Sequence, residues 1–334
     1  NKKKDIVEEL QKYFDDNKYN KNVIDINATN EYEELELATV TEHTRAYIKI
    51  QDGCNQFCSY CIIPYARGRI RSREFDNIKQ EVTELAQKGF KEIVLTGIHL
   101  SSYGNNENKL IDVVEMIAGI EGVERIRLGS LEPNIVTEDF AKRLAKVDKI
   151  CQHFHLSMQS GCDNTLKRMN RHYTSDEYFE KCELLRKYFD NPAFTTDVIV
   201  GFPGETEEDF EDTIDVVKKA KFDSAYTFIY SKRTGTPAAR MENQVPEDVV
   251  KDRFNRLLAT VNEVSHEHIR RYEGMDMKVL VEGKDDHEEG FVTGRMTNNI
   301  LVHFAGDESL IGQIVTVHLD ECKGFYYMGR LIED

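Results

Sequence analysis

Three cysteines in one short segment are the residues of this sequence most able to do chemistry. Cys54, Cys58 and Cys61 follow a Cys-x3-Cys-x2-Cys spacing. A closed structural zinc site or an ordinary electron-transfer cluster takes four protein ligands, so three thiolates leave one metal position open. We therefore predict that these three cysteines are catalytic and hold a 4Fe–4S cluster, with one iron free to bind a small molecule.

Two other interpretations of the cysteine loop stay open. One is a zinc knuckle with a distant fourth ligand, and the other is a disulfide loop. No apolar signal segment opens the chain and the remaining cysteines show no framework spacing, which disfavours disulfides. Phe57 and Tyr60 stand beside the cysteines, where they are placed to shield a cluster from water.

The segment that follows the cysteines carries a resemblance to a known family. It continues through Ile62-Ile-Pro-Tyr-Ala-Arg-Gly-Arg-Ile-Arg-Ser-Arg73. With the cysteines, it resembles the signature of the radical S-adenosylmethionine (SAM) enzymes, and among them the methylthiotransferases, which attach a CH3–S group to a tRNA adenosine or to a ribosomal protein side chain. The resemblance implies that the open iron binds the amino and carboxylate groups of SAM. It also implies that one electron, from a donor such as flavodoxin or ferredoxin, splits SAM into methionine and a 5′-deoxyadenosyl radical.

The same resemblance implies a second 4Fe–4S cluster, which supplies the sulfur after a first SAM has methylated it. In the family, its three cysteine ligands lie in an N-terminal domain. No cysteine precedes Cys54, so these ligands are absent from this sequence. Residues 1–37, which begin with Asn and have a short helical pattern around Ile6, Leu10 and Tyr13, resemble the last part of that domain.

Composition narrows the class of protein. The chain has 334 residues, of which 40% are hydrophobic, and no run approaches the roughly 18 apolar residues of a membrane span. We expect a soluble protein of the reducing cytoplasm, with no membrane partner. The net charge of −16 argues against indiscriminate nucleic-acid binding. Arg67, Arg69, Arg71 and Arg73 still predict a local basic patch for an RNA phosphate, unless they form ion pairs with the abundant acids.

Residues 38–272 are predicted to form the core domain, because β-rich runs alternate with helical ones. Six such units are two short of a full eight-fold barrel, and right-handed crossovers curl a parallel sheet into a partial one. The predicted fold class is α/β, a partial (β/α)6 barrel, and the family resemblance implies the same radical-SAM fold. Strands are expected at Ala46–Ile50, Glu92–Thr96, Arg125–Leu128, Phe154–Met158, Thr196–Val200 and Ala225–Tyr230.

Helix starts are readable in the core domain. Thr174 with Glu177 three residues later is typical of a capping box, and Thr206 with Asp209 is a weaker example. Pro246 suits the first turn of a helix.

Residues 273–334 change to short alternating runs with Gly turns, which predict a small antiparallel all-β barrel. This segment resembles the TRAM domain that ends the family's enzymes and binds their substrate. It carries 5 Lys and Arg against 13 Asp and Glu, a poor surface for tRNA and a better one for a basic protein. Its strands are expected at Val279–Val281, Gly290–Gly294, Ile300–Phe304, Gln313–His318 and Tyr326–Leu331.

The ends of the predicted parallel strands carry residues suited to a zwitterionic, nucleoside-bearing ligand. Thr96 and Gly97 close the second strand, where a glycine allows the backbone to approach a ligand amino group. Glu132 ends the third strand, and its carboxylate can accept from an ammonium or a ribose hydroxyl. The alternatives are a tight turn at Gly97 and a surface salt bridge at Glu132. Tyr60, in the cysteine loop, is a further predicted cofactor contact.

The fourth and fifth strands add the other predicted SAM contacts. Gln159 offers amide donors and an acceptor to ribose or substrate. Arg171, preferred over Arg168, is predicted to pair with the SAM carboxylate. Val200 and Gly201 are predicted to read an adenine edge through the backbone, and a capped strand-to-helix turn is a compatible alternative.

The other cysteines and the histidines show no metal-ligand pattern. Cys151, Cys162, Cys182 and Cys322 are expected to be buried small residues, with Cys162 of interest because it follows Gln159 closely. The ten histidines are expected to be solvated.

The substrate prediction rests on three segments. Residues 49–54, 61–68 and 97–104 look most like the enzyme that modifies N6-threonylcarbamoyladenosine at position 37 of tRNA, so we expect the tRNA anticodon stem-loop as partner. Residues 228–239 are equally typical of the isopentenyladenosine branch. The acidic C-terminal segment keeps the ribosomal protein S12 branch open.

Two hypotheses of other classes also stand. One is a non-catalytic RNA-binding fragment with structural zinc. The other is a radical-SAM enzyme that performs SAM cleavage or a carbon-radical reaction without sulfur insertion.

Overall fold

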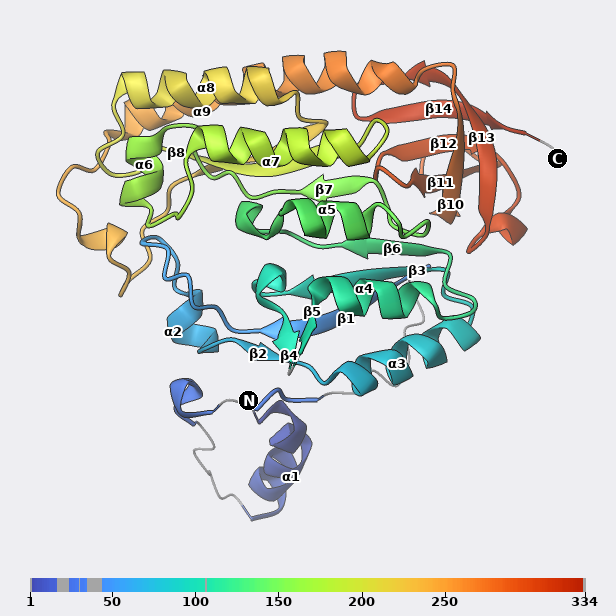
Figure 1. The fold of residues 1–334 in the computed structure, drawn as a ribbon, viewed down its shortest axis with the longest axis horizontal. Coiled ribbons are helices and arrows are strands. Elements are labelled where there is room, and N and C mark those ends of the chain that lie inside the picture. Colours follow the sequence, from blue (N-terminus) through green and yellow to red (C-terminus); the bar gives the residue numbers. More distant parts are fainter. Residues whose placement is uncertain (1, 17–23, 30, 35–43, 106, 333–334) are drawn as a thin grey trace.

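Parallel strands alternate with helices to build a partial barrel, and a small barrel made only of strands follows it (Figure 1). The computed structural model describes residues 2–16, 24–29, 31–34, 44–105 and 107–332. The six main strands are β1 (Arg45–Asp52), β3 (Glu92–Gly97), β6 (Arg125–Leu128), β7 (His153–His155), β8 (Ala193–Val200) and β9 (Ser224–Ile229).

Hydrogen bonding divides these strands into two sheets, with orders β2-β1-β3-β6 and β7-β8-β9. Isolated parallel bridges from Ile126 to Ile150 and from Leu131 to Leu156 join the two across the β6–β7 seam. The predicted α/β class and partial barrel of six parallel strands are therefore confirmed. The short strands β2 (Arg71–Ser72), β4 (Gly104–Asn105) and β5 (Asn108–Lys109) lie outside this set.

One predicted strand ends earlier than predicted. The prediction was Phe154–Met158, whereas β7 ends at His155. Beyond β7 the chain pairs with its neighbours only through isolated bridges, from Leu156 to Leu131 and from Gln159 to Val198.

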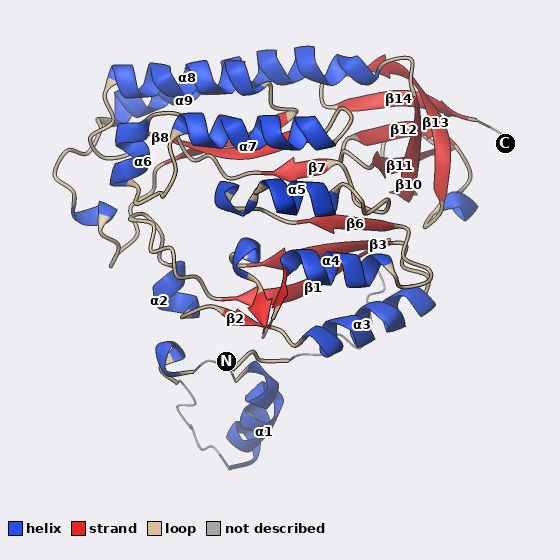
Figure 2. Cartoon of the chain, in the orientation of Figure 1, coloured by secondary structure: helices blue, strands red, loops and turns tan. Residues whose placement is uncertain are grey.

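Helices follow the strands and cover one face of the sheets, as Figure 2 shows by colour. They are α2 (Ile63–Arg67), α3 (Phe75–Gln87), α4 (Leu110–Ala118), α5 (Glu138–Leu144), α6 (Asp163–Arg168), α7 (Ser175–Tyr188), α8 (Glu207–Ala220) and α9 (Glu247–Ile269). The predicted capping box of Thr174 and Glu177 is confirmed, and Thr206 with Asp209 forms a complete one as well. Pro246 occupies the N-cap of α9 rather than its first turn.

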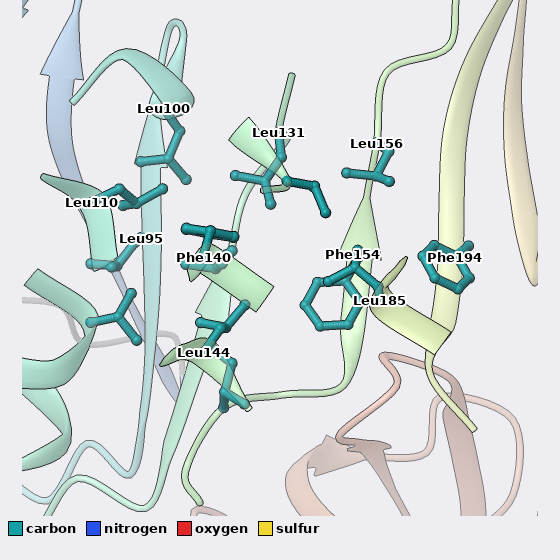
Figure 3. Packing of buried hydrophobic residues seen from close by; sticks show 14 of the residues in the cluster. Leu95, Leu100, Leu110, Leu131, Phe140, Leu144, Phe154, Leu156, Leu185 and Phe194 are labelled. Carbon is teal, nitrogen blue, oxygen red and sulfur yellow. The ribbon is translucent and has the colours of Figure 1, made fainter. Parts of the chain in front are cut away.

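The main hydrophobic core lies between the sheets and these helices (Figure 3). Alternate strand residues supply it, because successive side chains point to opposite faces of a sheet. Phe154 and Phe194 point into the core from neighbouring strands, and Leu185 of α7 packs there too. The opposite face of the strands is therefore free for polar side chains.

The C-terminal barrel closes in the order β10-β11-β12-β14-β13. Its strands are β10 (Asp276–Lys284), β11 (Phe291–Met296), β12 (Leu301–Ala305), β13 (Ile314–Cys322) and β14 (Tyr326–Leu331). The all-β prediction is confirmed, but the barrel is not wholly antiparallel, because β12 and β14 pair in parallel. The antiparallel β13–β14 hairpin inserts β14 beside β12, which fixes this direction.

Arginines of the partial barrel hold the C-terminal barrel in place. Arg125 donates to the carbonyls of Lys278 and Arg295 at 2.7 and 2.9 Å. Arg127 donates to the carbonyl of Thr297 at 2.9 Å and pairs at 2.6 Å with the buried Glu92. The strands that lead to the predicted site are thus bonded to the C-terminal barrel.

The N-terminal part contains α1 (Ile6–Asp16), which confirms the predicted helical pattern. The predicted domain boundary between residues 37 and 38 lies outside the described residues. At the other boundary, α9 ends at Ile269 and β10 begins at Asp276. Among the described residues, no helix has the length and apolarity needed to cross a membrane.

Candidate active site

The cysteine loop follows β1 and lies at the carboxyl ends of the parallel strands, where ligands bind in such sheets. All three cysteines are free thiols; Cys58 is buried, and Cys54 and Cys61 are partly exposed. Burial raises the pKa of the Cys54 and Cys61 thiols, and the neighbouring Cys58 thiolate adds to the rise in both. The three sulfurs are therefore close enough to interact electrostatically.

The donor set around the sulfurs suits a thiolate-bound cluster. The backbone N–H of Gln56 donates to the Cys54 sulfur at 3.4 Å, and Nη1 of Arg171 donates to the Cys58 sulfur at 3.4 Å. Hydrogen bonds to sulfur stabilise thiolates and tune clusters. In the described ranges, no three Cys, His, Asp or Glu side chains are arranged to hold a single metal ion. The cluster assignment therefore stays a prediction from the cysteine spacing and the family.

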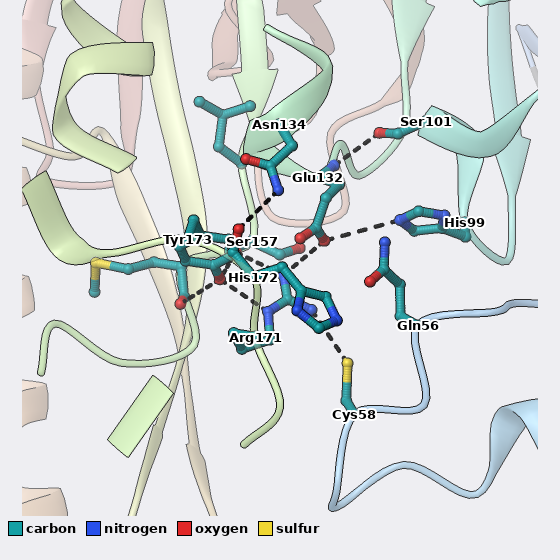
Figure 4. Close-up of polar contacts among 12 residues, drawn as sticks. Gln56, Cys58, His99, Ser101, Glu132, Asn134, Ser157, Arg171, His172 and Tyr173 are labelled. Carbon is teal, nitrogen blue, oxygen red and sulfur yellow. Dashed lines mark hydrogen bonds and ion pairs between the residues drawn. The ribbon is translucent and has the colours of Figure 1, made fainter. Parts of the chain in front are cut away.

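Arg171 is the centre of the polar contacts in Figure 4. Its Nη2 pairs with Oε2 of Glu132 at 2.7 Å, and its Nε donates to the hydroxyl of Tyr173 at 3.0 Å. Nη2 also reaches the carbonyl of Ser157 at 3.3 Å. These bonds occupy most of the guanidinium donors, so Arg171 joins the cysteine loop to Glu132 and has at most one N–H left for a ligand.

Glu132 is buried, contrary to the surface salt bridge that was its alternative. Its backbone N–H donates to Oγ of Ser101 at 2.8 Å. Oε2 lies 3.8 Å from Nε2 of His99. Among the described residues, this Nε2 is a buried atom without a hydrogen-bond partner. Glu132 thus stands between a cation and an unpaired ring nitrogen.

His99 and Gln51 are site residues that the sequence reasoning missed. Oε1 of Gln51 accepts from the backbone N–H of His99 at 2.7 Å, and its Nε2 donates to the carbonyls of Asp52 and Gly53 at 2.8 and 2.7 Å. Gln51 therefore ties the start of the cysteine loop to the loop after β3. For His99, its position between Ile98 and Leu100 just after a strand end was the available signal.

Tyr60 stands in the cysteine loop between Cys58 and Cys61, and its predicted contact with the cofactor stays a prediction. Its ring meets that of Phe202 edge-on, with centroids 6.3 Å apart. Burial raises the pKa of Tyr60 well above its ordinary value, so its hydroxyl stays protonated. Its ring lies among buried apolar side chains near the cysteines.

Thr96 and Gly97 close β3, and their own contacts are internal. Oγ1 of Thr96 donates to the carbonyl of Ile48 at 3.2 Å. A Cβ on Gly97 would lie 3.0 Å from the Cβ and Oε1 of Gln51. The small residue at position 97 is therefore required by packing against Gln51.

Gln159, four residues after the end of β7, is buried, and its backbone bonds to the carbonyl of Asp197 and the N–H of Ile199, both at 2.8 Å. In the part of the chain that the structure describes, its side-chain amide makes no hydrogen bond. This amide can therefore meet a ligand.

Val200 and Gly201 offer less of their backbone than predicted. The Val200 carbonyl accepts from the N–H of Tyr230 at 2.9 Å, and the Gly201 N–H donates to Oε1 of Glu205 at 3.0 Å. An adenine edge could reach the Gly201 carbonyl but not its N–H. Gly201 has a φ of 72° and packs against Val250, so the capped-turn interpretation holds here as well.

The predicted basic patch is wrong for two of its four arginines. Arg71 is buried and pairs with Asp52 at 3.3 Å. Arg73 is buried and pairs with Glu34 at 2.6 Å and with Glu81. Arg69 is exposed, 4.6 Å above the ring of Phe57. Arg71 and Arg73 are buried because they form ion pairs with acidic residues that are distant in the sequence.

Arg168 and the other cysteines lie elsewhere. Arg168 pairs with Asp209 at 2.7 Å, and Asp209 also accepts from the Cys162 thiol at 3.1 Å. Burial raises the pKa of Cys162 to about 11, so it is an unreactive thiol. Cys151 and Cys182 are buried as predicted, whereas Cys322 is partly exposed.

The prediction of solvated histidines is wrong for His153 and His155, which are buried on β7. Alternation with Phe154 and Leu156 in the sequence was the signal, because it predicts a polar face opposite the core.

Comparison with known proteins agrees with this geometry. The sequence model of the Radical SAM superfamily matches residues 48–217, and that of the TRAM domain matches residues 270–332. The chain is 48% identical over 293 residues to tRNA-2-methylthio-N(6)-dimethylallyladenosine synthase of Lachnoclostridium phytofermentans, covering 87% of this chain and 64% of that one. It is 47% identical over 293 residues to the same-named protein of Alkaliphilus oremlandii, covering 87% and 62%. The chain thus spans less than two thirds of the length of these curated relatives.

Solved structures share the fold at low sequence identity. Coproporphyrinogen III oxidase (HemN) from Escherichia coli, a radical SAM enzyme, matches with a TM-score of 0.51 and 16% identity over 87% of this chain and 73% of that one. The radical S-adenosylmethionine methyltransferase TsrM from Kitasatospora setae, solved with a 4Fe–4S cluster, matches with a TM-score of 0.50 and 19% identity over 58% and 38%. The chain belongs to the radical SAM superfamily, and membership implies a 4Fe–4S cluster and SAM.

Proposed function

We propose that this chain is the SAM-cleaving and RNA-binding part of a tRNA methylthiotransferase. The observation that carries the proposal is the Arg171–Glu132 pair beside Cys58, at the carboxyl ends of the half-barrel. The match to the TRAM domain in the same chain supports an RNA substrate. The relatives that share nearly half of its residues carry the name of such an enzyme.

Residue roles follow from the contacts. Cys54, Cys58 and Cys61 would hold the cluster, and the buried thiols would lose their protons on binding it. When bound, the cluster and SAM supply the radical chemistry. Arg171 keeps a positive charge at the Cys58 sulfur, and Glu132 presents its second oxygen to an ammonium or hydroxyl group. The Gln159 amide would bind ribose or substrate, because it makes no side-chain hydrogen bond among the described residues.

Tyr60, Val200 and Gly201 complete the proposed cleft. The partly buried Tyr60 ring would exclude water beside the cluster, as radical chemistry requires. Val200 and Gly201 would contact the adenine of SAM through van der Waals packing and through the Gly201 carbonyl. The Val200 carbonyl and the Gly201 N–H already form hydrogen bonds within the protein.

The substrate we propose is N6-dimethylallyladenosine, the isopentenyl form, at position 37 of tRNA, because the relatives' names state it. The threonylcarbamoyl form is a second candidate, favoured by residues 49–54, 61–68 and 97–104. The acidic C-terminal barrel, which favours a basic protein, is the observation behind the ribosomal protein alternative.

Nucleoside analysis separates these substrates. The native gene product that contains this chain would be expressed in a bacterium lacking its own tRNA methylthiotransferases, and the digested tRNA analysed by mass spectrometry. We expect the 2-methylthio form of dimethylallyladenosine. Its absence together with the 2-methylthio threonylcarbamoyl form would select the second candidate. Absence of both would overturn the proposed function.

A further inference from the structure

A polar and aromatic face lines the inner side of β7, β8 and β9, opposite the core. The register pairs His155 with Thr195 and Asp197 with Tyr226, and residues paired in register share one face of a sheet. Phe154 and Phe194 point the other way, into the core. This inner face therefore presents imidazole, hydroxyl, carboxylate and phenol groups together.

Hydrogen bonds order this face into a fixed array. Oγ1 of Thr195 bonds with Nε2 of His153 and with Nδ1 of His155, both at 3.0 Å. Nε2 of His155 bonds with Oδ2 of Asp197 at 3.2 Å. A hydroxyl has one proton, so Thr195 donates to one imidazole and accepts from the other. Asp197 keeps a further oxygen for a ligand.

Aromatic rings stand beside this carboxylate with much of their surface uncovered. Tyr226 is 55% exposed and Phe228 is 48% exposed, and two-residue spacing on β9 places them on the same face. The Tyr226 ring lies 5.9 Å from that of His155. Flat exposed rings next to fixed polar groups offer stacking and edge contacts to one planar ligand.

The face approaches the cysteine loop just beyond the carboxyl end of β7. The carbonyl of Ser157, two residues after the end of β7 at His155, accepts from Arg171 at 3.3 Å and from Tyr173 at 2.8 Å. Arg171 in turn donates to Cys58. A ligand on the face would therefore lie next to the proposed cofactor cleft.

Cations follow the aromatic strand directly. Lys232 and Arg233 are exposed and come three and four residues after the end of β9 at Ile229. Side chains of this kind contact phosphates without reading sequence. The aromatic rings of β9 are thus followed in the sequence by two cations that could contact RNA phosphates.

We propose that Tyr226, Phe228, His155 and Asp197 form a pocket for a purine nucleobase turned out of an RNA loop. Tyr226 and Phe228 stack on the base, and Asp197, oriented by His155, accepts from a base N–H. Enzymes that act on a base take it out of its stack to reach it. This assignment rests on the proposed function, because the base in question is the adenine that the proposed enzyme modifies.

An abasic comparison tests the pocket. The reconstituted chain would be titrated anaerobically with a fluorescein-labelled anticodon stem-loop that carries N6-dimethylallyladenosine, and with one that is abasic at that position. We expect wild type to prefer the base-containing RNA by about 5- to 160-fold, the range for one stacked base. Tyr226→Ala should bring the ratio of Kd values close to one, Asp197→Ala should lower it by removing the acceptor, and Tyr226→Phe should keep the ratio of wild type.

Controls separate a failed fold from a failed inference. Phe14→Ala, which removes another exposed aromatic ring far along the sequence, should leave the ratio unchanged. Cluster content and thermal melting would establish that each variant folds. A wild-type ratio of one, or a Tyr226→Ala ratio equal to that of wild type, would overturn the pocket. A strong ratio with no methylthiolated nucleoside would keep the pocket and reject the proposed function.

Discussion

Arg171 donates from Nη1 to the sulfur of Cys58 at 3.4 Å while its Nη2 holds Glu132 at 2.7 Å. One guanidinium therefore sets the charge at a proposed cluster ligand and the orientation of a proposed SAM contact. Both partners are buried, where such a pair is strongest and its disruption most costly.

Replacing Arg171 by Met should impair the cluster and the fold at once. Loss of a positive charge beside Cys58 favours the oxidised cluster, so its reduction potential should fall by roughly tens of millivolts. The stranded Glu132 carboxylate should cost about 3–5 kcal/mol of stability. Redox titration followed by electron paramagnetic resonance measures the first effect, and urea unfolding the second.

A double variant distinguishes these effects. Arg171→Met with Glu132→Gln should recover much of the stability but not the potential, because no charge is restored at Cys58. Arg168→Met, which removes a guanidinium that pairs with Asp209 instead, should leave the potential unchanged. An unchanged potential in the Arg171 variant would contradict the assigned role.

Gly201→Ala should distort the loop after β8. Its φ of 72° is unfavourable for a side chain, and the new Cβ would lie 2.6 Å from Cγ2 of Val250. Gly89 has a similar φ of 93° with nothing within 4 Å, so Gly89→Ala reports backbone strain alone. We expect about 1 kcal/mol of destabilisation at position 89 and at least twice that at position 201.

Calorimetric melting compares the two alanine variants directly. Equilibrium dialysis with SAM should show weaker binding only for Gly201→Ala, because position 89 precedes β3 at its amino end, opposite the carboxyl ends that carry the proposed SAM contacts. Equal loss of stability in both variants would mean that Val250 moves aside without cost.

Arg125→Met should loosen the C-terminal barrel. Two charge-assisted bonds to the Lys278 and Arg295 carbonyls would be lost, each worth roughly 1.5–3 kcal/mol. We expect faster proteolytic cleavage between Ile269 and Asp276, with cluster content preserved. Arg330→Met, at an exposed pair with Asp320, is the matched control, and an identical cleavage rate in both would refute the coupling.

Acid should destabilise the protein partly through His268. Burial, together with the positive charges of Arg271, Arg186 and Lys221, lowers its pKa to about 3. An unfolded histidine titrates near pH 6.5, so the unfolded chain gains a proton that the folded chain refuses. Stability from this group is full above about pH 6.5 and is lost as pH falls towards 3.

Urea unfolding at several pH values tests this contribution. Because His268 is partly exposed, its share should be no more than about 0.7 kcal/mol per pH unit, half of the unscreened value. His268→Gln should flatten the acid limb by that amount. A variant with the same pH slope as wild type would show that other groups carry it.

Local sequence patterns predicted the fold well, and long-range pairings explain where they failed. The strands β6 (Arg125–Leu128) and β14 (Tyr326–Leu331) match their predicted bounds, because apolar runs between turn residues are local signals. Parallel pairing of β14 with β12 depends on a closure that no local pattern contains.

In the candidate active site, too, local features were predicted from the sequence and long-range contacts were not. Cysteine spacing is local and located the loop, whereas the ion pairs of Arg71 with Asp52 and of Arg73 with Glu34 join residues 19 and 39 positions apart. Their burial could not be predicted from a run of arginines. His155 and Asp197 meet only because β7 and β8 are neighbours in the sheet.

The most direct test of the account is anaerobic reconstitution of the chain with iron and sulfide, beside a variant with Cys54, Cys58 and Cys61 replaced by alanine. Iron and sulfide analysis would be followed by electron paramagnetic resonance of the reduced protein with and without SAM. We predict about four irons per chain, a signal that SAM alters, and 5′-deoxyadenosine as product, all lost in the variant. Stoichiometric zinc, with no response to SAM and no 5′-deoxyadenosine, would contradict it.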